Sequence, residues 1–166
     1  KTQTPAAPAR MNSHLPLLPT PFVGRRTEVE QIKSLLMSPD HRLVTLVGPG
    51  GIGKTRLSIQ SASELVDEFS DGVWFVPLAS LQAAEAIVPA MAKTLDLSFS
   101  MKEEHPRRQL MDFLREKRLV LILDNYEHLL DEGTGLIGDL LLNAKDLKLL
   151  VTSRERLNLQ GEQLYP

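Results

Sequence analysis

Hydrophobic and polar positions follow two patterns that alternate along this chain. Short apolar runs that end in glycine, proline or polar residues predict buried strands at 43–47, 73–76, 119–123 and 148–152. Elsewhere apolar residues recur with the period of amphipathic helices. Such helices are expected at 28–37, 54–69, 83–95, 106–118 and 136–142. This alternation of strands and helices favours a three-layer α/β fold with a mostly parallel central sheet.

Individual residues refine several of these boundaries. Thr27 and Glu30 have the spacing of a capping box, so the first helix is expected to begin at Glu28. Pro77 is expected to end the second strand, because proline cannot continue a central hydrogen-bond ladder. Residues 163–165 are compatible with the start of a fifth strand.

The first apolar run leads into a glycine-rich loop at 48–55. This loop matches the phosphate-binding pattern G-x-x-x-x-G-K-[ST], and it lies between a strand and a helix as that motif requires. Its glycines leave backbone N–H groups free to surround phosphates, and the helix that follows adds its dipole. Lys54 is expected to reach the β- and γ-phosphates, and the Thr55 hydroxyl to bind Mg²⁺. An ordinary glycine turn is the alternative, but a chance match should arise in roughly one chain in a few hundred.

Two later strands bring charged side chains to the same edge of the sheet. The third apolar run ends in Asp124, a carboxylate suited to hold Mg²⁺ directly or through water. Asn125 follows where many ATPases have a second acid. Glu127 is the nearest replacement, although a solvated acid at a helix start explains it equally well. Arg154 follows the fourth strand, and the ligand side of a parallel sheet is its carboxyl edge. It is therefore either a γ-phosphate sensor or one exposed arginine among many.

Composition limits the choice of function. The chain has 166 residues with 42% hydrophobic content, which is enough for one domain with a core. Its net charge of −2 is too small to indicate nucleic acid or an acidic membrane surface. It has no cysteine, which excludes disulfides, zinc–thiolate sites and thiol nucleophiles. No apolar run has the length of a bilayer span and no signal peptide is recognised. We expect a cytoplasmic domain with no direct nucleic-acid or membrane contact.

Residues 1–20 differ from the rest of the chain. They are rich in proline and alanine, a composition that cannot build a packed core and is typical of a flexible tail or linker. The nucleotide-binding domain is therefore expected to span 21–166. The chain begins with Lys1 instead of methionine, so we expect a fragment of a longer protein.

Five stretches in this order resemble the nucleotide-binding domain of STAND ATPases. They are Phe-Val-Gly-Arg at 22–25, the glycine loop at 48–55, Val-Trp-Phe-Val at 73–76, Leu-Asp-Asn-Tyr-Glu-His at 123–128 and Val-Thr-Ser-Arg-Glu at 151–155. The resemblance is greatest to the NB-ARC-like domains of large bacterial transcriptional regulators, and it covers about 21–166. It implies a P-loop fold in which the Asp124 strand does not adjoin the phosphate-loop strand, with the Thr152 strand between them.

The resemblance also implies roles for individual residues. Catalytic roles fall on Lys54, Asp124 and Arg154, with Arg154 contacting the γ-phosphate, and Mg²⁺ is held by Thr55 and Asp124. The stretch at 22–25 lines the adenine and ribose side of the pocket. The expected contacts with ATP or ADP are Phe22, Val23, Gly24, Arg25, Gly48, Pro49, Gly50, Gly51, Ile52, Gly53, Lys54, Thr55 and Arg56.

Members of this family usually act as switches, closed with ADP and open and self-associated with ATP. The expected function is thus Mg-dependent ATP/ADP binding with slow hydrolysis, coupled to other domains of a larger regulator. Arg26 stands where the family commonly has glutamate, and Asn125 replaces a second acid, so efficient hydrolysis is not expected. The alternatives are an AAA+-like motor or loader, an interaction module that keeps only the fold, and a small-molecule kinase. Measuring multiple-turnover ATP hydrolysis distinguishes the switch from the motor or loader. The effect of Lys54→Ala on affinity for ATP and ADP distinguishes it from a module that keeps only the fold.

Overall fold

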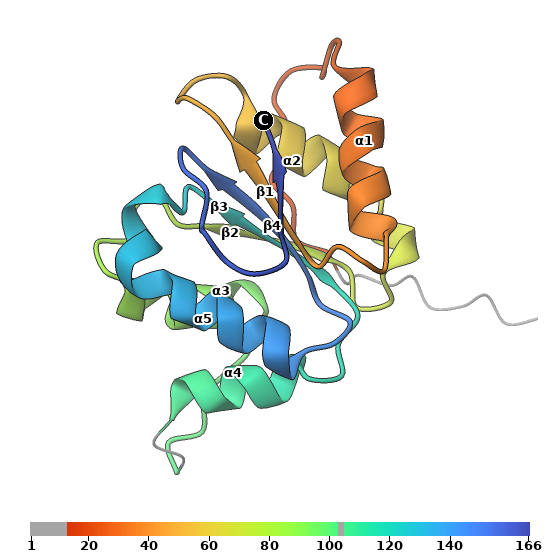
Figure 1. Ribbon diagram of the computed structural model, residues 1–166. Coiled ribbons are helices and arrows are strands. Elements are labelled where there is room, and N and C mark those ends of the chain that lie inside the picture. The colour runs from red at the N-terminus through yellow and green to blue at the C-terminus, as the bar shows by residue number, and fades with distance from the viewer. Residues whose placement is uncertain (1–12, 103–104) are drawn as a thin grey trace, which may run out of the picture.

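A single five-stranded parallel sheet forms the centre of the computed structural model, which describes residues 13–102 and 105–166 (Figure 1). The strand order is β2-β3-β4-β1-β5. The strands are β1 (Leu43–Val47), β2 (Val73–Pro77), β3 (Val120–Asp124), β4 (Lys148–Ser153) and β5 (Glu162–Tyr165). β4 therefore lies between the Asp124 strand and the phosphate-loop strand, as predicted, and the fifth strand is present.

Helices cover both faces of this sheet (Figure 1). One face carries α1 (Arg26–Met37) and α2 (Lys54–Ser63); the other carries α3 (Ile87–Thr94), α4 (Pro106–Leu114) and α5 (Leu130–Asn143). Short 3₁₀ turns are η1 (Val66–Glu68), η2 (Ala84–Ala86) and η3 (Glu127–Leu129). The three-layer α/β fold expected from the sequence is confirmed, and among the described residues no helix is long and apolar enough to cross a bilayer.

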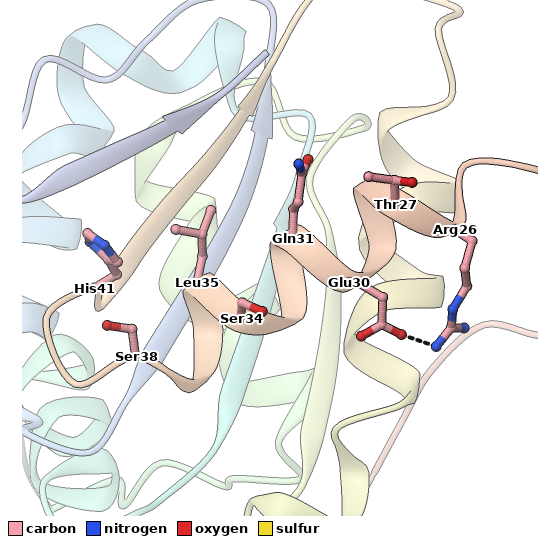
Figure 2. A pocket seen from close by; sticks show the side chains of 8 residues that line it. All are labelled: Arg26, Thr27, Glu30, Gln31, Ser34, Leu35, Ser38 and His41. Carbon is pink, nitrogen blue, oxygen red and sulfur yellow. Dashed lines mark hydrogen bonds and ion pairs between the residues drawn. The ribbon is translucent and has the colours of Figure 1, made fainter.

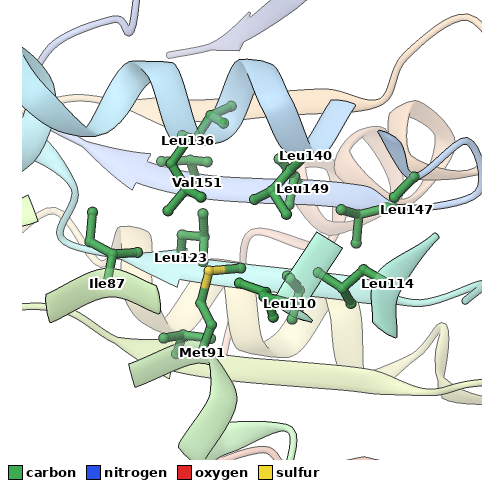
Figure 3. Close-up of a cluster of buried hydrophobic side chains, with 14 of the residues drawn as sticks. Ile87, Met91, Leu110, Leu114, Leu123, Leu136, Leu140, Leu147, Leu149 and Val151 are labelled. Atoms are coloured by element: carbon green, nitrogen blue, oxygen red, sulfur yellow. The ribbon is translucent and has the colours of Figure 1, made fainter. Parts of the chain in front are cut away.

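The central strand β3 shows why its sequence is apolar throughout. Successive side chains of a strand point to opposite faces, so Leu121 and Leu123 enter the cluster beneath α3 to α5. Ile122 enters the cluster beneath α1 and α2. Figure 3 shows the first cluster, in which Leu123 lies with Met91 and Leu136 between the sheet and the helices. Because both faces are buried, the run cannot alternate with polar residues.

Several helix boundaries differ from the sequence expectation. The helix expected at 136–142 is α5, which begins at Leu130, where a turn was expected. α1 begins at Arg26 and not at Glu28, because Arg25 takes a left-handed conformation (φ 56°) at the N-cap, where no side chain caps the helix. The capping box based on Thr27 is therefore absent. α2 ends at Ser63, and a 3₁₀ turn continues the chain. Leu65 and Phe69 nevertheless stay buried, which explains why the apolar period extended past the helix end.

The helix expected at 83–95 is divided into η2 and α3. Pro89 lies within the first turn of α3, where a missing backbone N–H costs no intrahelical hydrogen bond. The chain before it tightens into a 3₁₀ turn instead of extending the α-helix. The helix opened by Pro106 ends at Leu114.

Part of the proline-rich segment is packed on the domain. His14 donates its backbone N–H to Val73 O at 3.0 Å and accepts from Phe75 N at 3.0 Å, beside β2. Leu15 and Leu18 pack against the cluster beneath α1 and α2. The edge strand β2 offers unpaired backbone groups that composition alone does not reveal. The expected tail thus differs from the structure over these residues, while residues 1–12 lie outside the described part of the chain.

Candidate functional site

The loop between β1 and α2 has a backbone that only glycine suits at several positions. Gly51 (φ 82°) and Gly53 (φ 87°) are in the left-handed region, where other residues are strained. A Cβ atom on Gly50 would lie 2.9 Å from Nη2 of Arg154. The glycines predicted from the motif therefore allow both the turn itself and the close approach of an arginine from another strand.

Lys54 opens α2 and folds back over this loop. Its Nζ donates hydrogen bonds to Gly48 O at 2.7 Å and Pro49 O at 2.8 Å. Gly53 at the N-cap has no side chain, so the first backbone N–H groups of α2 have no side-chain cap. The loop thus combines one ammonium group with the amides and dipole of a helix start, which together form an anion-binding environment.

Asp124 connects this helix to the two central strands. Its Oδ1 accepts hydrogen bonds from Thr55 Oγ1 and from Thr152 Oγ1, both at 2.7 Å. The carboxylate is only 7% exposed. Thr152 Oγ1 also accepts from the backbone N–H of Asn125 at 2.9 Å. The two residues expected to hold Mg²⁺, Thr55 and Asp124, are thus in direct contact.

The donor set at this point fits Mg²⁺. Mg²⁺ prefers hard oxygen ligands and is usually bound by one or two protein groups together with substrate phosphates and water. Thr55 Oγ1 and Asp124 Oδ1 supply those oxygens beside the glycine loop. Within the described residues there is no group of three or more histidine, cysteine or acidic side chains that would hold a metal without a nucleotide.

Arg154 leaves the end of β4 and reaches across to the loop after β3. Its Nε lies 3.6 Å from Oε1 of Glu127, and its guanidinium lies against Gly50. The Arg154 side chain is 65% exposed, against 24% for Glu127. The sequence placed Arg154 at the carboxyl edge with Lys54 and Asp124, and the structure brings all three to that edge.

The stretch before α1 touches the glycine loop through Arg25. Arg25 Nη1 donates to Ile52 O at 2.9 Å, and its Nε bonds Glu28 at 3.3 Å. Phe22 packs on the hydrophobic cluster, whereas Val23 is exposed. The side chain of Arg56 donates to Thr20 O and Pro21 O at 3.1 and 3.3 Å, and its guanidinium lies 6.0 Å from the Phe22 ring centroid. The expected nucleotide contact of Arg56 stays a prediction.

Sequence reasoning gave no role to Thr152 or Tyr126. Thr152 joins Asp124 to Asn125 across two strands. Tyr126 is fully buried, donates its hydroxyl to Gly133 O at 2.7 Å, and has its pKa raised by burial. A polar residue at the end of an otherwise apolar strand was the available signal for Thr152; nothing comparable marked Tyr126.

A separate pocket of about 640 Å³ runs along the outer side of α1 (Figure 2). Its lining comes mainly from α1, with Ser38 and His41 contributed by the chain after the helix end. Arg26 and Glu30 bond each other at one end of it. None of the residues predicted to bind phosphate or metal lines this pocket, so it is distinct from the site at the glycine loop.

The chain is similar in sequence to known proteins. The chain is 37% identical over 147 residues to an uncharacterized protein of Mycobacterium tuberculosis, covering 86% of this chain and 36% of that protein. It is 41% identical over 126 residues to another M. tuberculosis protein, provisionally named an HTH-type transcriptional regulator, covering 74% of this chain and 14% of that protein. The chain therefore spans only a minor part of these relatives.

A solved structure has the same fold at low sequence identity. It is a Signal Transduction ATPase with Numerous Domains (STAND) protein with a tetratricopeptide repeat sensor from Pyrococcus horikoshii, with a TM-score of 0.60 and 18% identity. The likeness covers 95% of this chain and 24% of that one. The sequence model of the NB-ARC domain matches residues 25–157, which include the glycine loop, Asp124 and Arg154. The chain belongs to the NB-ARC domain family of P-loop ATPase-like proteins.

Proposed function

We propose that this chain is an ATP/ADP-binding domain that acts as a nucleotide-controlled switch within a longer regulator. The observation that carries the proposal is the contact of Thr55 with Asp124 directly beside Lys54 and the uncapped start of α2. A hydroxyl and a carboxylate for Mg²⁺, next to an ammonium and free amides for phosphate, form the set that a nucleoside triphosphate requires.

Each group has a distinct task in this proposal. Backbone N–H groups of the loop and the Lys54 ammonium bind the phosphates, while Arg25 supports the loop through Ile52 O. Thr55 and Asp124 orient Mg²⁺ through their oxygens. When bound, Mg²⁺ neutralises charge on the β- and γ-phosphates. Arg154 contacts the γ-phosphate and so distinguishes ATP from ADP.

Hydrolysis is proposed to be slow. A water molecule attacks the γ-phosphorus, the bond from that phosphorus to the β,γ-bridging oxygen breaks, and ADP leaves with the electron pair. Asn125 follows Asp124 with an uncharged amide, which cannot accept the proton of that water. We propose that the proton passes to phosphate or solvent, and that ATP persists long enough to serve as a signal.

The regulatory role is inferred from the relatives. One of them carries the name of a transcriptional regulator, and this chain covers 14% of its length. We propose that the remaining parts of such a chain provide the sensor and effector domains, and that ATP favours self-association. The net charge of −2 supports a domain that does not itself contact nucleic acid.

Isothermal titration with Mg·ADP and with a non-hydrolysable Mg·ATP analogue tests binding. Lys54→Ala is expected to weaken affinity by about 10- to 100-fold, because a charge-assisted contact with phosphate is lost. Lys93→Ala, at an exposed lysine of α3, is the matched control and should leave the affinity for both nucleotides unchanged. Equal affinity for wild type and Lys54→Ala would reject nucleotide binding at this loop and favour a domain that keeps only the fold.

Multiple-turnover hydrolysis of ATP tests the switch against an AAA+-like motor. We expect less than about one turnover per minute, below the usual range of enzymes. Turnover at about 1 per second or faster, with a requirement for assembled rings, would favour the motor instead.

A further inference from the structure

Arg154 is shared between two neighbours at the carboxyl edge of the sheet. Its Nη2 lies close enough to Gly50 that a Cβ there would approach within 2.9 Å. On the other side its Nε faces Oε1 of Glu127 at 3.6 Å. The guanidinium therefore lies between the phosphate loop and a carboxylate, and it is the exposed member of this pair.

The Glu127 side chain is more buried than that of Arg154, with 24% exposed against 65%. It follows Tyr126, whose backbone N–H donates to Thr152 O at 3.0 Å and whose buried hydroxyl donates to Gly133 O. Oε2 of Glu127 is enclosed, and among the described residues no hydrogen-bond partner reaches it. Burying a carboxylate in this way is costly unless a cation lies beside it, and Arg154 is that cation.

Neither Asn125 nor Asp124 can replace Glu127 as the partner of Arg154. Asn125 stands directly after Asp124 with a left-handed backbone (φ 63°) and an uncharged side chain. Asp124 is occupied by Thr55 and Thr152. Glu127 is thus the carboxylate of this strand end that faces Arg154.

We propose that Glu127 is a positioning residue that sets the preference between ATP and ADP by competing with the γ-phosphate for Arg154. This inference rests on the proposed nucleotide binding. With ADP, Arg154 stays paired with Glu127. With ATP, the exposed arginine turns to the terminal phosphate, and the ion pair is given up. Because that pair must be broken only for ATP, Glu127 weakens ATP binding and leaves ADP binding unchanged.

Titrations with Mg·ADP and a non-hydrolysable Mg·ATP analogue on four forms of the chain test the competition. The forms are wild type, Glu127→Gln, Arg154→Ala and the double variant. Glu127→Gln is expected to tighten binding of the ATP analogue about two- to fivefold, the upper range for a partly exposed ion pair, and to leave ADP affinity unchanged. In the Arg154→Ala background, Glu127→Gln should have little further effect on affinity for the ATP analogue, because the arginine for which Glu127 and the γ-phosphate compete is absent.

Glu132→Gln, at an exposed glutamate early in α5, is the matched control and should leave both affinities unchanged. If Glu127→Gln does not fold, Glu127→Asp keeps the charge but withdraws it from Arg154, and it should tighten the ATP analogue in the same direction. Equal changes for ATP and ADP, weaker ATP binding, or the full effect in the Arg154→Ala background would overturn the competition. Equal nucleotide affinity for wild type and Lys54→Ala, in the titration that tests the proposed function, would instead overturn nucleotide binding itself.

Discussion

A parallel sheet has a carboxyl edge, where its strands end, and an amino edge, where they begin. Each of these edges holds a lysine that donates to backbone carbonyl groups, yet the surroundings of the two lysines differ. At the carboxyl edge, Lys54 donates to Gly48 O and Pro49 O of the glycine loop. At the amino edge, Lys148 donates to Ser38 O and His41 O, just after α1. The bonds are of the same kind, so the lysine contacts alone do not distinguish a binding site from a structural one.

The neighbours of each lysine make the distinction. Burial, then the charges of Arg42 and Arg118, lower the pKa of Lys148. Arg42 donates to Leu141 O and Ala144 O and so closes the end of α5. At the amino edge, the cations thus donate hydrogen bonds at or just after helix ends, where carbonyl groups have no intrahelical partner.

The carboxyl edge has what the amino edge lacks. Beside Lys54 lie the amides at the start of α2 and the Thr55–Asp124 pair, which suit phosphate and Mg²⁺. A cation that donates to carbonyl groups thus serves stability where those groups end a helix. It serves binding where anion donors and a metal-binding pair lie beside it.

The largest predicted effect on stability concerns Arg42. Arg42→Ala leaves two carbonyl groups at the end of α5 without their donor, and it should lower the free energy of unfolding by about 2–3 kcal/mol. That corresponds to a fall in melting temperature of about 5–10 °C. Calorimetry measures the fall, while Mg·ADP affinity at a temperature where the variant is folded should not change. A variant that melts normally but loses ADP would make the amino edge part of the binding site.

A smaller effect separates the two threonines that share Asp124. Thr152→Val removes a donor to Asp124 and the acceptor of the Asn125 N–H, and it should cost about 1–2 kcal/mol in urea unfolding. Thr55→Val removes only one donor and should cost less than about 1 kcal/mol.

Binding should rank these two variants in the opposite way. Thr55→Val is expected to reduce Mg-dependent nucleotide affinity about tenfold, because a ligand of the metal is lost. Thr152→Val, whose side chain is buried behind Asp124, should reduce it less. If both variants lowered affinity and stability by the same ratio, the site would not be separable from the fold as proposed.

A further small effect on stability is predicted at Glu64, the residue that follows α2. Hydrogen bonds from Arg26 and then Lys33 lower the pKa of Glu64 to about 2. A carboxyl group whose pKa is lowered on folding stabilises the protein above its ordinary pKa, and this contribution is lost as the pH falls toward the folded value.

Glu64→Gln should therefore melt about 2–4 °C below wild type at pH 6. Because the stabilisation disappears between about pH 4.5 and about pH 2, the difference should narrow at pH 3.5. Melting curves of both forms at the two pH values measure this. A difference that widens in acid would show that the charge of Glu64 does not stabilise the fold.

The sequence predicted the fold well because the signals were local and strong. Apolar runs marked the strands, and the glycine loop with Lys54 and Thr55 is contiguous in sequence. The strand order followed from the family resemblance. The predicted start of α1 was wrong because Arg25 adopts a left-handed conformation, which its residue type does not indicate. The packing of residues 13–18 depends on the edge of β2, which lies far away in sequence.

The candidate site was predictable in part for the same reason. Motif spacing indicated Lys54 and Thr55, an apolar strand that ends in an acid indicated Asp124, and the placement of strand ends put Arg154 at the same edge. The links made by Thr152 and by the Glu127–Arg154 pair join separate strands, so no local pattern encodes them. Arg56 follows the motif directly, yet its guanidinium is drawn to Thr20 O and Pro21 O by the packed segment before α1.

Backbone amide NMR during titration with Mg·ADP tests the central contrast between the two edges most directly. Every described edge residue except proline has its own amide signal, so one experiment observes both edges without mutation. The account predicts shifts concentrated at 22–25, 48–56 and 124–127, with signals at 38–42 and 145–148 unchanged. Shifts confined to the amino edge, or none at 48–56 at saturating Mg·ADP, would contradict it.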